Sequence, residues 1–329
     1  MLEFELNKIE NKKIGKIYKP LYVGNYISIE KALNGGYVKK NTELLLVKID
    51  NKNIVAFSKH IMAFHHIAEG YLNEKPYMLT FCVICNSGMV MNPEVNGKML
   101  HFYVAGVYNG MLLMTDKESS SYWDHITGKC LHGKYLNYQL QILHSHEIQT
   151  AEELLTTCPD SQYGIPKINF LQKLLSYFQN WKASIKGEGF LPPGFRKSMM
   201  EIDNRLPEME MGIGIWNDNH LSKFYTLKVI KENGKQIIDT FYNHNVLIYI
   251  SPLNKNPIAI YVDDIIKAEF NNDRLELSNG NYITSGRMFS RDGHEIKMVQ
   301  PNQMFSRWYG FVLTFPNCKI LNKTDANVL

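Results

Sequence analysis

Two cysteines in the first half of the chain have a spacing that supports chemistry. Cys82 and Cys85 form a C-x-x-C pair at the end of an apolar run, and Asn-Ser-Gly follows them. Two thiols at this spacing can bind one metal ion or form a disulfide with each other. The sequence therefore predicts a metal-binding or reactive site at this pair.

Imidazoles are concentrated in the same half of the chain. Eight of the 11 histidines lie within the first 146 residues: His60, His65, His66, His101, His125, His132, His144 and His146. Two thiolates with one or two imidazoles suit Zn(II) or Cu(I). The sequence has no second C-x-x-C pair, so isolated residues would complete such a site and could leave one coordination position open. Neighbouring side chains point to different sides of an element, so only one of His65 and His66 is expected to reach the thiols.

Two other interpretations of the pair stay open. In thiol–disulfide exchange, a Cys82 thiolate would attack and Cys85 would resolve the intermediate. Thioredoxin-like motifs precede a helix, whereas Met89-Val90-Met91 here has the apolar character of a strand. Alternatively, the two cysteines are small buried side chains in a turn, and the protein is a non-catalytic scaffold or binding module. The other three cysteines are expected to be buried thiols.

The elements that carry these residues are predominantly strands. Short β-branched and aromatic runs are separated by clusters of Asn, Gly, Asp and Lys, a pattern that predicts strands and turns. These runs are 44–49, 54–57, 77–82, 99–104, 111–115, 212–216, 246–250, 258–262, 275–277 and 311–315. Residues 168–182 have apolar positions at helical spacing, which predicts an amphipathic helix. A Gly- and Pro-containing linker follows this helix and ends the first half.

The strand pattern recurs in the second half of the chain. Residues 76–91 align without a gap on residues 245–260, which places Cys82 and Cys85 opposite Ser251 and Asn254. Two further pairs of segments follow in the same order, 47–57 with 213–224 and 155–160 with 312–317. We therefore expect an α+β, mostly β fold of two diverged β-rich repeats joined by an amphipathic helix. The expected domains are 1–165 with the C-x-x-C site, 166–195 with the helix and linker, and 196–329 without the cysteines.

Composition limits the class of protein. The chain has 329 residues, of which 45% are hydrophobic, and its 36 basic and 32 acidic residues are interspersed. No basic block is present, so nucleic acid is not an expected partner. The sequence contains no signal-peptide pattern and no window of about 20 apolar residues, which predicts a cytoplasmic protein without a membrane partner. A small molecule or a protein is the expected partner.

Several segments resemble a known family. Residues 81–88, Phe-Cys-Val-Ile-Cys-Asn-Ser-Gly, resemble the Tyr-Cys-Pro-Leu-Cys-Gly/Asn-Thr/Ser-Gly signature of the family called domain of unknown function 3179 (DUF3179). Residues 104–116, Ser121-Tyr-Trp123 and Thr127-Gly128 are similar to its downstream segments, and the resemblance is best over 45–165. It implies that His65, Cys82 and Cys85 act as one unit. The family supplies no reaction, and His66 replaces its Glu after the histidine.

The sequence thus predicts a metal-binding protein in which Cys82, Cys85 and His65 hold Zn or Cu. Whether it is an enzyme is left open by the residues. If it is one, Asp116, Trp123 and His125 are the candidate catalytic residues, by analogy with the segments that resemble the family. The alternatives are a thiol–disulfide redox protein using Cys82 and Cys85, and a scaffold or binding module.

Overall fold

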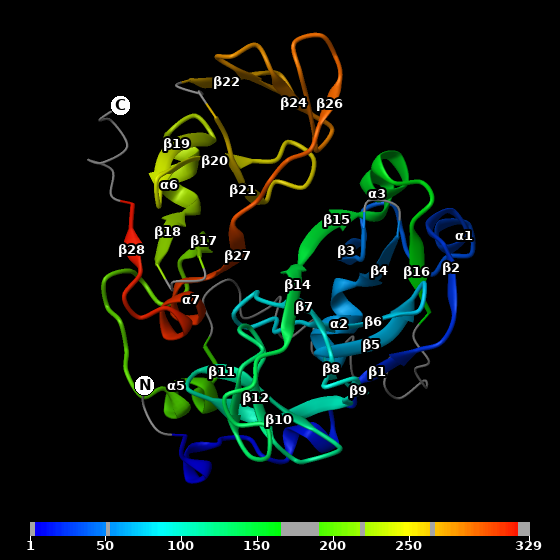
Figure 1. Cartoon of the computed structure of the whole chain (residues 1–329), viewed down its shortest axis with the longest axis vertical. Helices are drawn as coiled ribbons and strands as arrows, with labels where there is room; N and C mark the ends of the chain where they lie inside the picture. Colours follow the sequence, from blue (N-terminus) through cyan, green and yellow to red (C-terminus); the bar gives the residue numbers. More distant parts are fainter. Residues whose placement is uncertain (1–3, 51–52, 166–190, 218–220, 264–266, 322–329) are drawn as a thin grey trace. The chain divides into compact units, whose positions relative to one another are not determined.

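The chain divides into two compact units. The computed structural model describes residues 4–50, 53–165, 191–217, 221–263 and 267–321 (Figure 1). Clustering of its internal contacts gives unit 1, Met1–Arg205, and unit 2, Leu206–Leu329. The structure is mostly β, with 44% strand and 15% helix.

Unit 1 contains three main sheets within its described residues. The first sheet has the strand order β15 (Glu147–Thr150), β3 (Glu43–Lys48), β4 (Ile54–Ser58), β16 (Gln162–Gly164) and β2 (Tyr26–Ser28). The second has the order β1 (Leu21–Val23), β5 (Ile67–Leu72), β6 (Lys75–Thr80), β7 (Met89–Asn92) and β14 (Gln141–Ser145). The third runs β10 (Phe102–Tyr108), β11 (Met111–Asp116), β12 (Tyr122–Asp124) and β13 (Cys130–His132), and β8 (Glu94–Val95) pairs with β9 (Lys98–Met99) in a separate ribbon.

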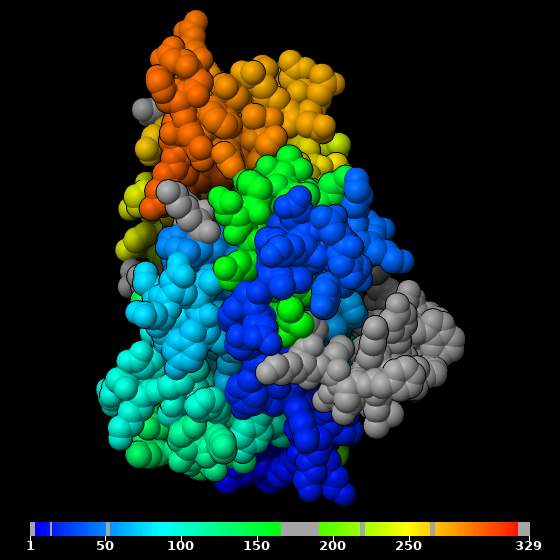
Figure 2. All heavy atoms as spheres, turned by 90° about the vertical axis from the view of Figure 1, so that its right-hand side faces the viewer, coloured from blue at the N-terminus to red at the C-terminus, as the bar shows by residue number. Residues whose placement is uncertain are grey.

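Short helices lie between these strands. They are η1 (Leu6–Lys8), η2 (Ile14–Lys16), α1 (Ile29–Asn34), α2 (Lys59–His65), α3 (Ala151–Thr157) and α5 (Pro193–Ser198). Thr150 begins α3 with a capping box, because its side chain accepts a hydrogen bond from the Glu153 amide and the Glu153 side chain accepts one from the Thr150 amide. Helices α1 (blue) and α3 (green) lie side by side (Figures 1 and 2). Both contribute apolar residues to the core on one face of the first sheet.

Unit 2 also contains three sheets within its described residues. The first has the strand order β27 (Asn302–Arg307), β17 (Met211–Trp216), β18 (Ser222–Thr226) and β28 (Lys319–Ile320). The second has the order β19 (Gln236–Phe241), β20 (His244–Ile250) and β21 (Pro257–Tyr261). The third has the order β22 (Ala268–Asn271), β23 (Arg274–Leu277), β24 (Tyr282–Thr284), β25 (Arg287–Phe289) and β26 (Glu295–Ile296). Its helices are α6 (Leu227–Glu232) and α7 (Trp308–Thr314).

Burial on both faces explains why several strands are continuous apolar runs. In β20, Val246 and Ile248 enter the core toward the first sheet of unit 2, whereas Leu247 and Tyr249 enter the core toward the third. In β3, Leu45 and Leu46 likewise belong to two different cores. A strand covered on both faces needs no polar alternation, so its sequence shows little period-2 pattern.

Each unit completes its first sheet with strands from its own C-terminal part. In unit 1, β15 pairs antiparallel with β3, α3 follows, and β16 pairs parallel with β4. In unit 2, β27 pairs antiparallel with β17, α7 follows, and β28 pairs parallel with β18. The same connection therefore closes the first sheet of both units.

The expected fold class is wrong. The described strands form six sheets of three to five strands, three in each unit, and sheets of this size are typical of the blades of a β-propeller. The fold is therefore not two β-rich repeats joined by an amphipathic helix. Similar pairs of segments in the two halves led us to expect two long repeats. Such similarity shows which segments correspond, but it does not show how many sheets each half forms. The helix expected over 168–182 lies outside the described residues.

One predicted strand is a helix. The run 311–315 was expected to be a strand, but it overlaps helix α7, in which Trp308, Phe311 and Val312 are buried. A short apolar run without polar alternation is equally compatible with a buried strand and a buried helix. Within the described residues, no helix has the length and apolar character that crossing a membrane requires.

Candidate functional site

The two cysteines lie in a tight turn between β6 and β7, here called the thiol turn (residues 82–87). Its ends form a bridge, in which the Cys82 amide donates to the Ser87 carbonyl at 2.8 Å and the Ser87 amide donates to the Cys82 carbonyl at 3.2 Å. Asn86 adopts a left-handed conformation with φ of 50°, which Asn tolerates better than most residues. Cys82 and Cys85 are 1% and 0% exposed, and neither is in a disulfide.

Cys82 has a stabilised thiolate. Hydrogen bonding from the Cys85 side chain and from the Cys85 and Ile84 amides lowers the pKa of Cys82, and outweighs burial, which acts in the opposite direction. Successive backbone N–H groups in a turn form an anion-binding concavity. The turn itself therefore supplies the stabilisation that a helix N-terminus supplies in thioredoxin-like sites.

Cys85 has the opposite character. Burial and the neighbouring Cys82 raise its pKa well above the ordinary value. The Ser87 hydroxyl lies 2.7 Å from Cys85 Sγ, and the same hydroxyl lies 3.4 Å from His125 Nε2. The three side chains form a buried chain from thiol through hydroxyl to imidazole.

His125 enters this chain from the segment that follows β12. Its carbonyl accepts a hydrogen bond from Thr80 Oγ1 at 3.0 Å, which ties it to the end of β6. Burial lowers the pKa of the imidazole, so the ring is neutral at neutral pH. Its Nδ1 is buried and makes no hydrogen bond to a described residue. A neutral imidazole can accept a proton at Nε2.

The two adjacent histidines have different roles. His66 caps α2 in a left-handed conformation, with φ of 62°, and its Nδ1 is 2.9 Å from the carbonyl of Phe81, the residue before the thiol turn. Burial, with a smaller effect of the neighbouring His125, lowers its pKa to about 4. His65 Nδ1 instead lies 2.6 Å from the Lys19 carbonyl. His66, rather than His65, contacts the backbone that leads into the thiol turn.

Asp116 and Trp123 form a local structural network. The Asp116 carboxylate accepts hydrogen bonds from the Ser119 amide at 2.6 Å, the Ser121 amide at 3.1 Å and Trp123 Nε1 at 2.9 Å. These bonds fix the connection from β11 to β12 and occupy both oxygens. Of the three candidate catalytic residues, His125 is the one whose contacts reach the thiol turn.

The predicted metal ligands are not gathered into a metal centre. Among the residues that the structure describes, no three or more His, Cys, Asp or Glu lie together as a group that could hold a metal ion. Two thiolates alone are half of a zinc site. The Zn or Cu site of Cys82, Cys85 and His65 therefore stays a prediction.

The same turn occurs in unit 2 without thiols. The Ser251 amide donates to the Asn256 carbonyl at 2.9 Å, and Lys255 is left-handed with φ of 58°. These residues align with Cys82, Ser87 and Asn86 in the ungapped alignment. The turn therefore forms with Ser251 and Asn254 in place of the two cysteines.

Comparison with known proteins supplies a family. The family described as protein of unknown function (DUF3179) matches residues 14–314, which is most of the chain. The chain belongs to this family. The resemblance seen over residues 45–165 is thus confirmed, and the match extends through unit 2. No curated protein and no solved structure matches the chain.

Sequence reasoning did not select Ser87 and His66 as members of the site. The Ser of the Asn-Ser-Gly triplet is visible in the sequence, but its contact with Cys85 depends on the closure of the turn. His66 was expected to compete with His65 for the thiols, and only the left-handed end of α2 decides which of them turns toward Phe81.

Proposed function

We propose that this DUF3179 protein is a thiol–disulfide redox protein, in which Cys82 and Cys85 are oxidised reversibly by a small peroxide. The supporting observation is the arrangement of two unbridged thiols in one closed turn, with the Ser87 hydroxyl 2.7 Å from Cys85 Sγ, and the lowered pKa of Cys82 and raised pKa of Cys85 agree with it. A thiolate is the attacking species, and a protonated neighbour serves as the resolving thiol.

The reaction consists of two steps. The Cys82 thiolate attacks one peroxide oxygen, the O–O bond breaks, and the departing hydroxide takes a proton to give water. Cys85 then loses its proton through Ser87 to His125, its sulfur attacks Cys82 Sγ, and the S–O bond of the sulfenic acid breaks with release of a second water. The dithiol loses two electrons and the peroxide gains them. A small thiol reductant returns the disulfide to two thiols.

Burial limits the oxidant. Both cysteines are almost fully buried, so a folded protein disulfide cannot approach Cys82 Sγ without opening of the turn. A peroxide is small enough to diffuse through transient openings. A dithiol that is reduced between oxidation events also fits the cytoplasmic location that the sequence predicts.

The turn in unit 2 argues against a purely structural role of the thiols. Residues 251–256 keep one of the two backbone hydrogen bonds that close the thiol turn, from the residue 251 amide to the residue 256 carbonyl, and keep its left-handed position without any cysteine. Because the fold does not need thiols to form this turn, their presence in unit 1 calls for a chemical explanation. This observation favours the redox protein over the scaffold.

The test is oxidation of the reduced protein with hydrogen peroxide, followed by alkylation under denaturing conditions and mass spectrometry. We expect a Cys82–Cys85 disulfide, loss of two of the five alkylated thiols, and recovery of both with dithiothreitol. Cys85→Ser should trap a sulfenic acid at Cys82 that reacts with dimedone. Ser87→Ala should slow disulfide formation at least about tenfold, since the proton path from Cys85 is lost.

A matched control is Cys130→Ser, because Cys130 is a buried thiol whose pKa burial raises to about 11. This variant should oxidise like the parent protein. Failure of the parent to form the disulfide, or sulfenic acid at a cysteine other than Cys82, would refute the redox proposal. One equivalent of zinc or copper in the purified protein, lost in Cys82→Ser, would support the metal site instead.

A further inference from the structure

A buried carboxyl group in the second sheet of unit 1 has an oxygen without a partner. Glu69 on β5 is 2% exposed, and its Oε1 accepts a hydrogen bond from the Phe102 amide at 2.6 Å. Its Oε2 is buried and makes no hydrogen bond. A buried carboxylate without compensation is costly, and protonation would leave an O–H without an acceptor instead. In either protonation state, Oε2 of Glu69 therefore lacks a hydrogen-bond partner.

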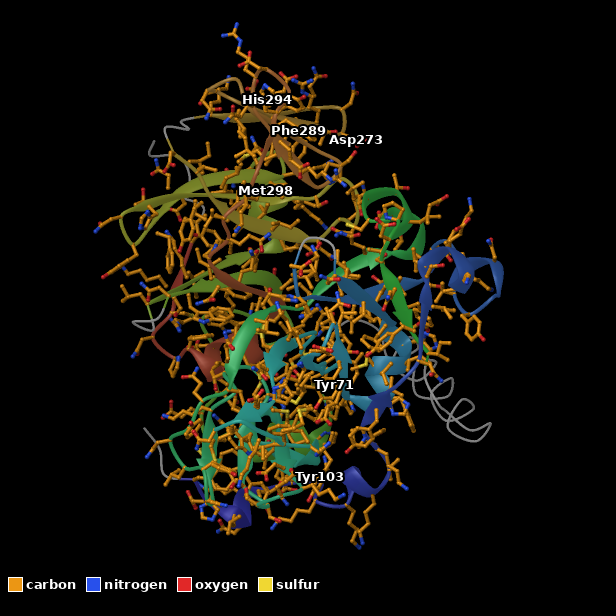
Figure 3. All side chains as sticks on the ribbon, turned by 45° about the vertical axis from the view of Figure 1, so that its right-hand side comes forward. Tyr71, Tyr103, Asp273, Phe289, His294 and Met298 are labelled. Atoms are coloured by element: carbon orange, nitrogen blue, oxygen red, sulfur yellow. The ribbon has the colours of Figure 1, made fainter. Side chains whose placement is uncertain are left out.

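Aromatic and acidic side chains lie near Glu69. Tyr22 on β1 is the direct neighbour of Glu69 in the parallel pair β1–β5, and it is 50% exposed. Burial, followed by the charges of Glu69, Glu118 and Tyr103, raises the pKa of Tyr22 to about 12, so these side chains are close enough to Tyr22 to interact with it. Figure 3 labels Tyr103 and the exposed Tyr71, two residues beyond Glu69 on β5.

The charge of this cluster is not balanced. His101 is paired with Glu118, with Nδ1 2.8 Å from Oε1, and its ring centroid lies 5.9 Å from that of Tyr22. The groups that shift the pKa of Glu69 are burial, the Phe102 amide and Glu118, and they include no cation; the net effect raises the pKa to about 8. The imidazole of His101 therefore pairs with Glu118, and Glu69 has no cationic partner among these groups.

We propose that Tyr22, Glu69, Glu118 and Tyr103 form a binding site for a small aliphatic amine, whose primary ammonium group bonds to Oε2 of Glu69. An ammonium group supplies the missing donor and the missing positive charge together. The faces of Tyr22 and Tyr103 add cation–π attraction. Tyr22 is half-exposed and is the direct strand neighbour of Glu69, so a slim primary ammonium should reach Oε2 after a rotation of the Tyr22 side chain, whereas a quaternary ammonium is too wide.

The probe is 1,4-diaminobutane, titrated into the full-length protein by calorimetry at pH 7. We expect one site per chain and a heat that depends on the ionisation enthalpy of the buffer, because binding of a cation displaces a proton from Glu69. Glu69→Gln keeps the shape and the acceptor for the Phe102 amide but removes the charge, and should weaken binding at least tenfold. Glu118→Gln and Tyr22→Ala should weaken it less.

Controls separate this site from nonspecific attraction. Glu94→Gln removes an exposed carboxylate of the same unit and should leave the affinity unchanged. Tetramethylammonium should not compete with 1,4-diaminobutane. Absence of binding, equal affinity of Glu69→Gln and Glu94→Gln, or equal binding of tetramethylammonium would overturn the proposal. Binding of a lysine-containing peptide without binding of 1,4-diaminobutane would also overturn it, since the ligand would then be a protein.

Discussion

At the scale of single residues, the thiol turn depends on the atoms packed directly against it. Gly88 follows the turn, and a Cβ at this position would lie 2.1 Å from the Thr80 carbonyl oxygen. The Gly88 carbonyl also lies 2.9 Å from His146 Nδ1. Glycine is therefore required here by close approach of the backbone, as is common where a strand pairs tightly beside a turn.

Substitution of Gly88 tests this packing. Gly88→Ala forces the backbone of β6 and β7 apart, and should lower the free energy of unfolding by about 2–3 kcal/mol. Gly24→Ala is the matched control, since a Cβ there meets nothing within 4 Å, and should change stability by less than about 0.5 kcal/mol. Urea unfolding followed by tryptophan fluorescence measures both. Equal stabilities of the two variants would contradict the packing at Gly88.

At the scale of elements, the turns after β6 and β20 have the same shape and different chemistry. The two turns share the hydrogen bond from the amide of the first residue to the carbonyl of the sixth, and a left-handed fifth residue, so positions 251 and 254 correspond to 82 and 85. The sheets supply the turn in both units, and the side chains at two positions decide whether it can be oxidised.

Thiols transferred to unit 2 should therefore behave as a pair. In a Cys82→Ser/Cys85→Ser background, the double substitution Ser251→Cys/Asn254→Cys should restore an intramolecular disulfide upon oxidation with diamide. The single substitution Ser251→Cys in that background should not form this bond. Peptide mapping by mass spectrometry distinguishes them, and two free thiols in the double variant would show that the turns differ in geometry.

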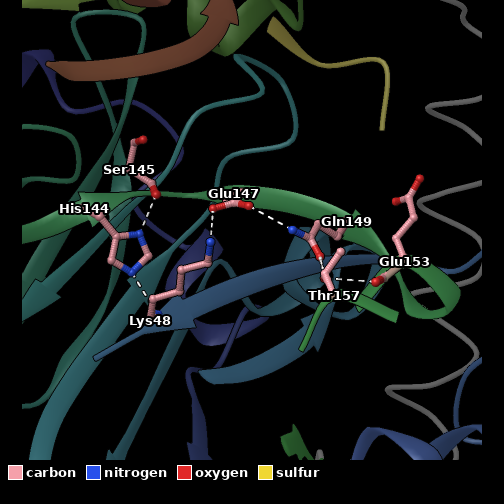
Figure 4. Close-up of polar contacts among 7 residues, drawn as sticks. All are labelled: Lys48, His144, Ser145, Glu147, Gln149, Glu153 and Thr157. Carbon is pink, nitrogen blue, oxygen red and sulfur yellow. Dashed lines mark hydrogen bonds and ion pairs between the residues drawn. The ribbon is translucent and has the colours of Figure 1, made fainter. Parts of the chain in front are cut away.

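A polar chain joins β3, β14, β15 and α3 (Figure 4). Lys48 pairs with Glu147, Glu147 accepts from Gln149, and the Gln149 side-chain oxygen accepts from Thr157. The Lys48 amide also donates to His144 Nε2 at 2.9 Å. Burial raises the pKa of Glu147, but Lys48 outweighs it and the net effect is a lowered pKa.

Loss of Lys48 should destabilise unit 1. The Lys48 and Glu147 side chains are 35% and 30% exposed, so Lys48→Met should cost about 1–2 kcal/mol, between the values for surface and buried ion pairs. Lys40→Met is the control, because the pair of Lys40 with Glu152 is highly exposed, and should have little effect. Because the pKa of Glu147 is lowered in the folded protein, Glu147 stabilises the fold at pH values above its unfolded-state pKa. This stabilisation is lost as the pH falls below about 4.5. Urea unfolding at pH 7 and pH 4 checks both statements.

At the scale of the whole molecule, buried titratable groups of unit 1 act on stability in opposite directions. Burial lowers the pKa of His66 and His146 to about 4, so the unfolded chain binds more protons between pH 4 and the ordinary value of 6.5. Stability therefore rises with pH in that range. Burial raises the pKa of Glu69 from 4.5 to about 8, so its contribution is present at low pH and is lost as the pH rises to 8.

These opposing contributions predict a stability maximum near pH 6.5. Below it, the two histidines outweigh Glu69; above it, Glu69 lowers stability, with a limiting slope of about 1.4 kcal/mol per pH unit, and the lowered pKa of Cys82 opposes this decline. Glu69→Gln should remove the decline between pH 6.5 and 8. The free energy of unfolding of both proteins at half-unit pH intervals measures this. An unchanged decline in Glu69→Gln would assign it to other groups.

The sequence by itself determined the local features. The C-x-x-C pair marked the position of the site, apolar runs separated by turn residues predicted several of the central strands, such as β3, β4 and β20, and the ungapped alignment predicted that Ser251 and Asn254 occupy the positions of the thiols. The family resemblance rested on residues within single segments, and it is confirmed over most of the chain. These features depend on residue type and short spacing, which a sequence records directly.

Only the tertiary structure decided how distant segments combine. The six blade-sized sheets need pairing between strands far apart in sequence, such as β3 with β15, and no local pattern specifies that pairing. The contact of Ser87 with His125, the choice of His66 over His65, and the unpartnered oxygen of Glu69 likewise depend on which elements pack together. Local spacing cannot show burial, and burial shifts the pKa of Cys85, His125 and Glu69 here.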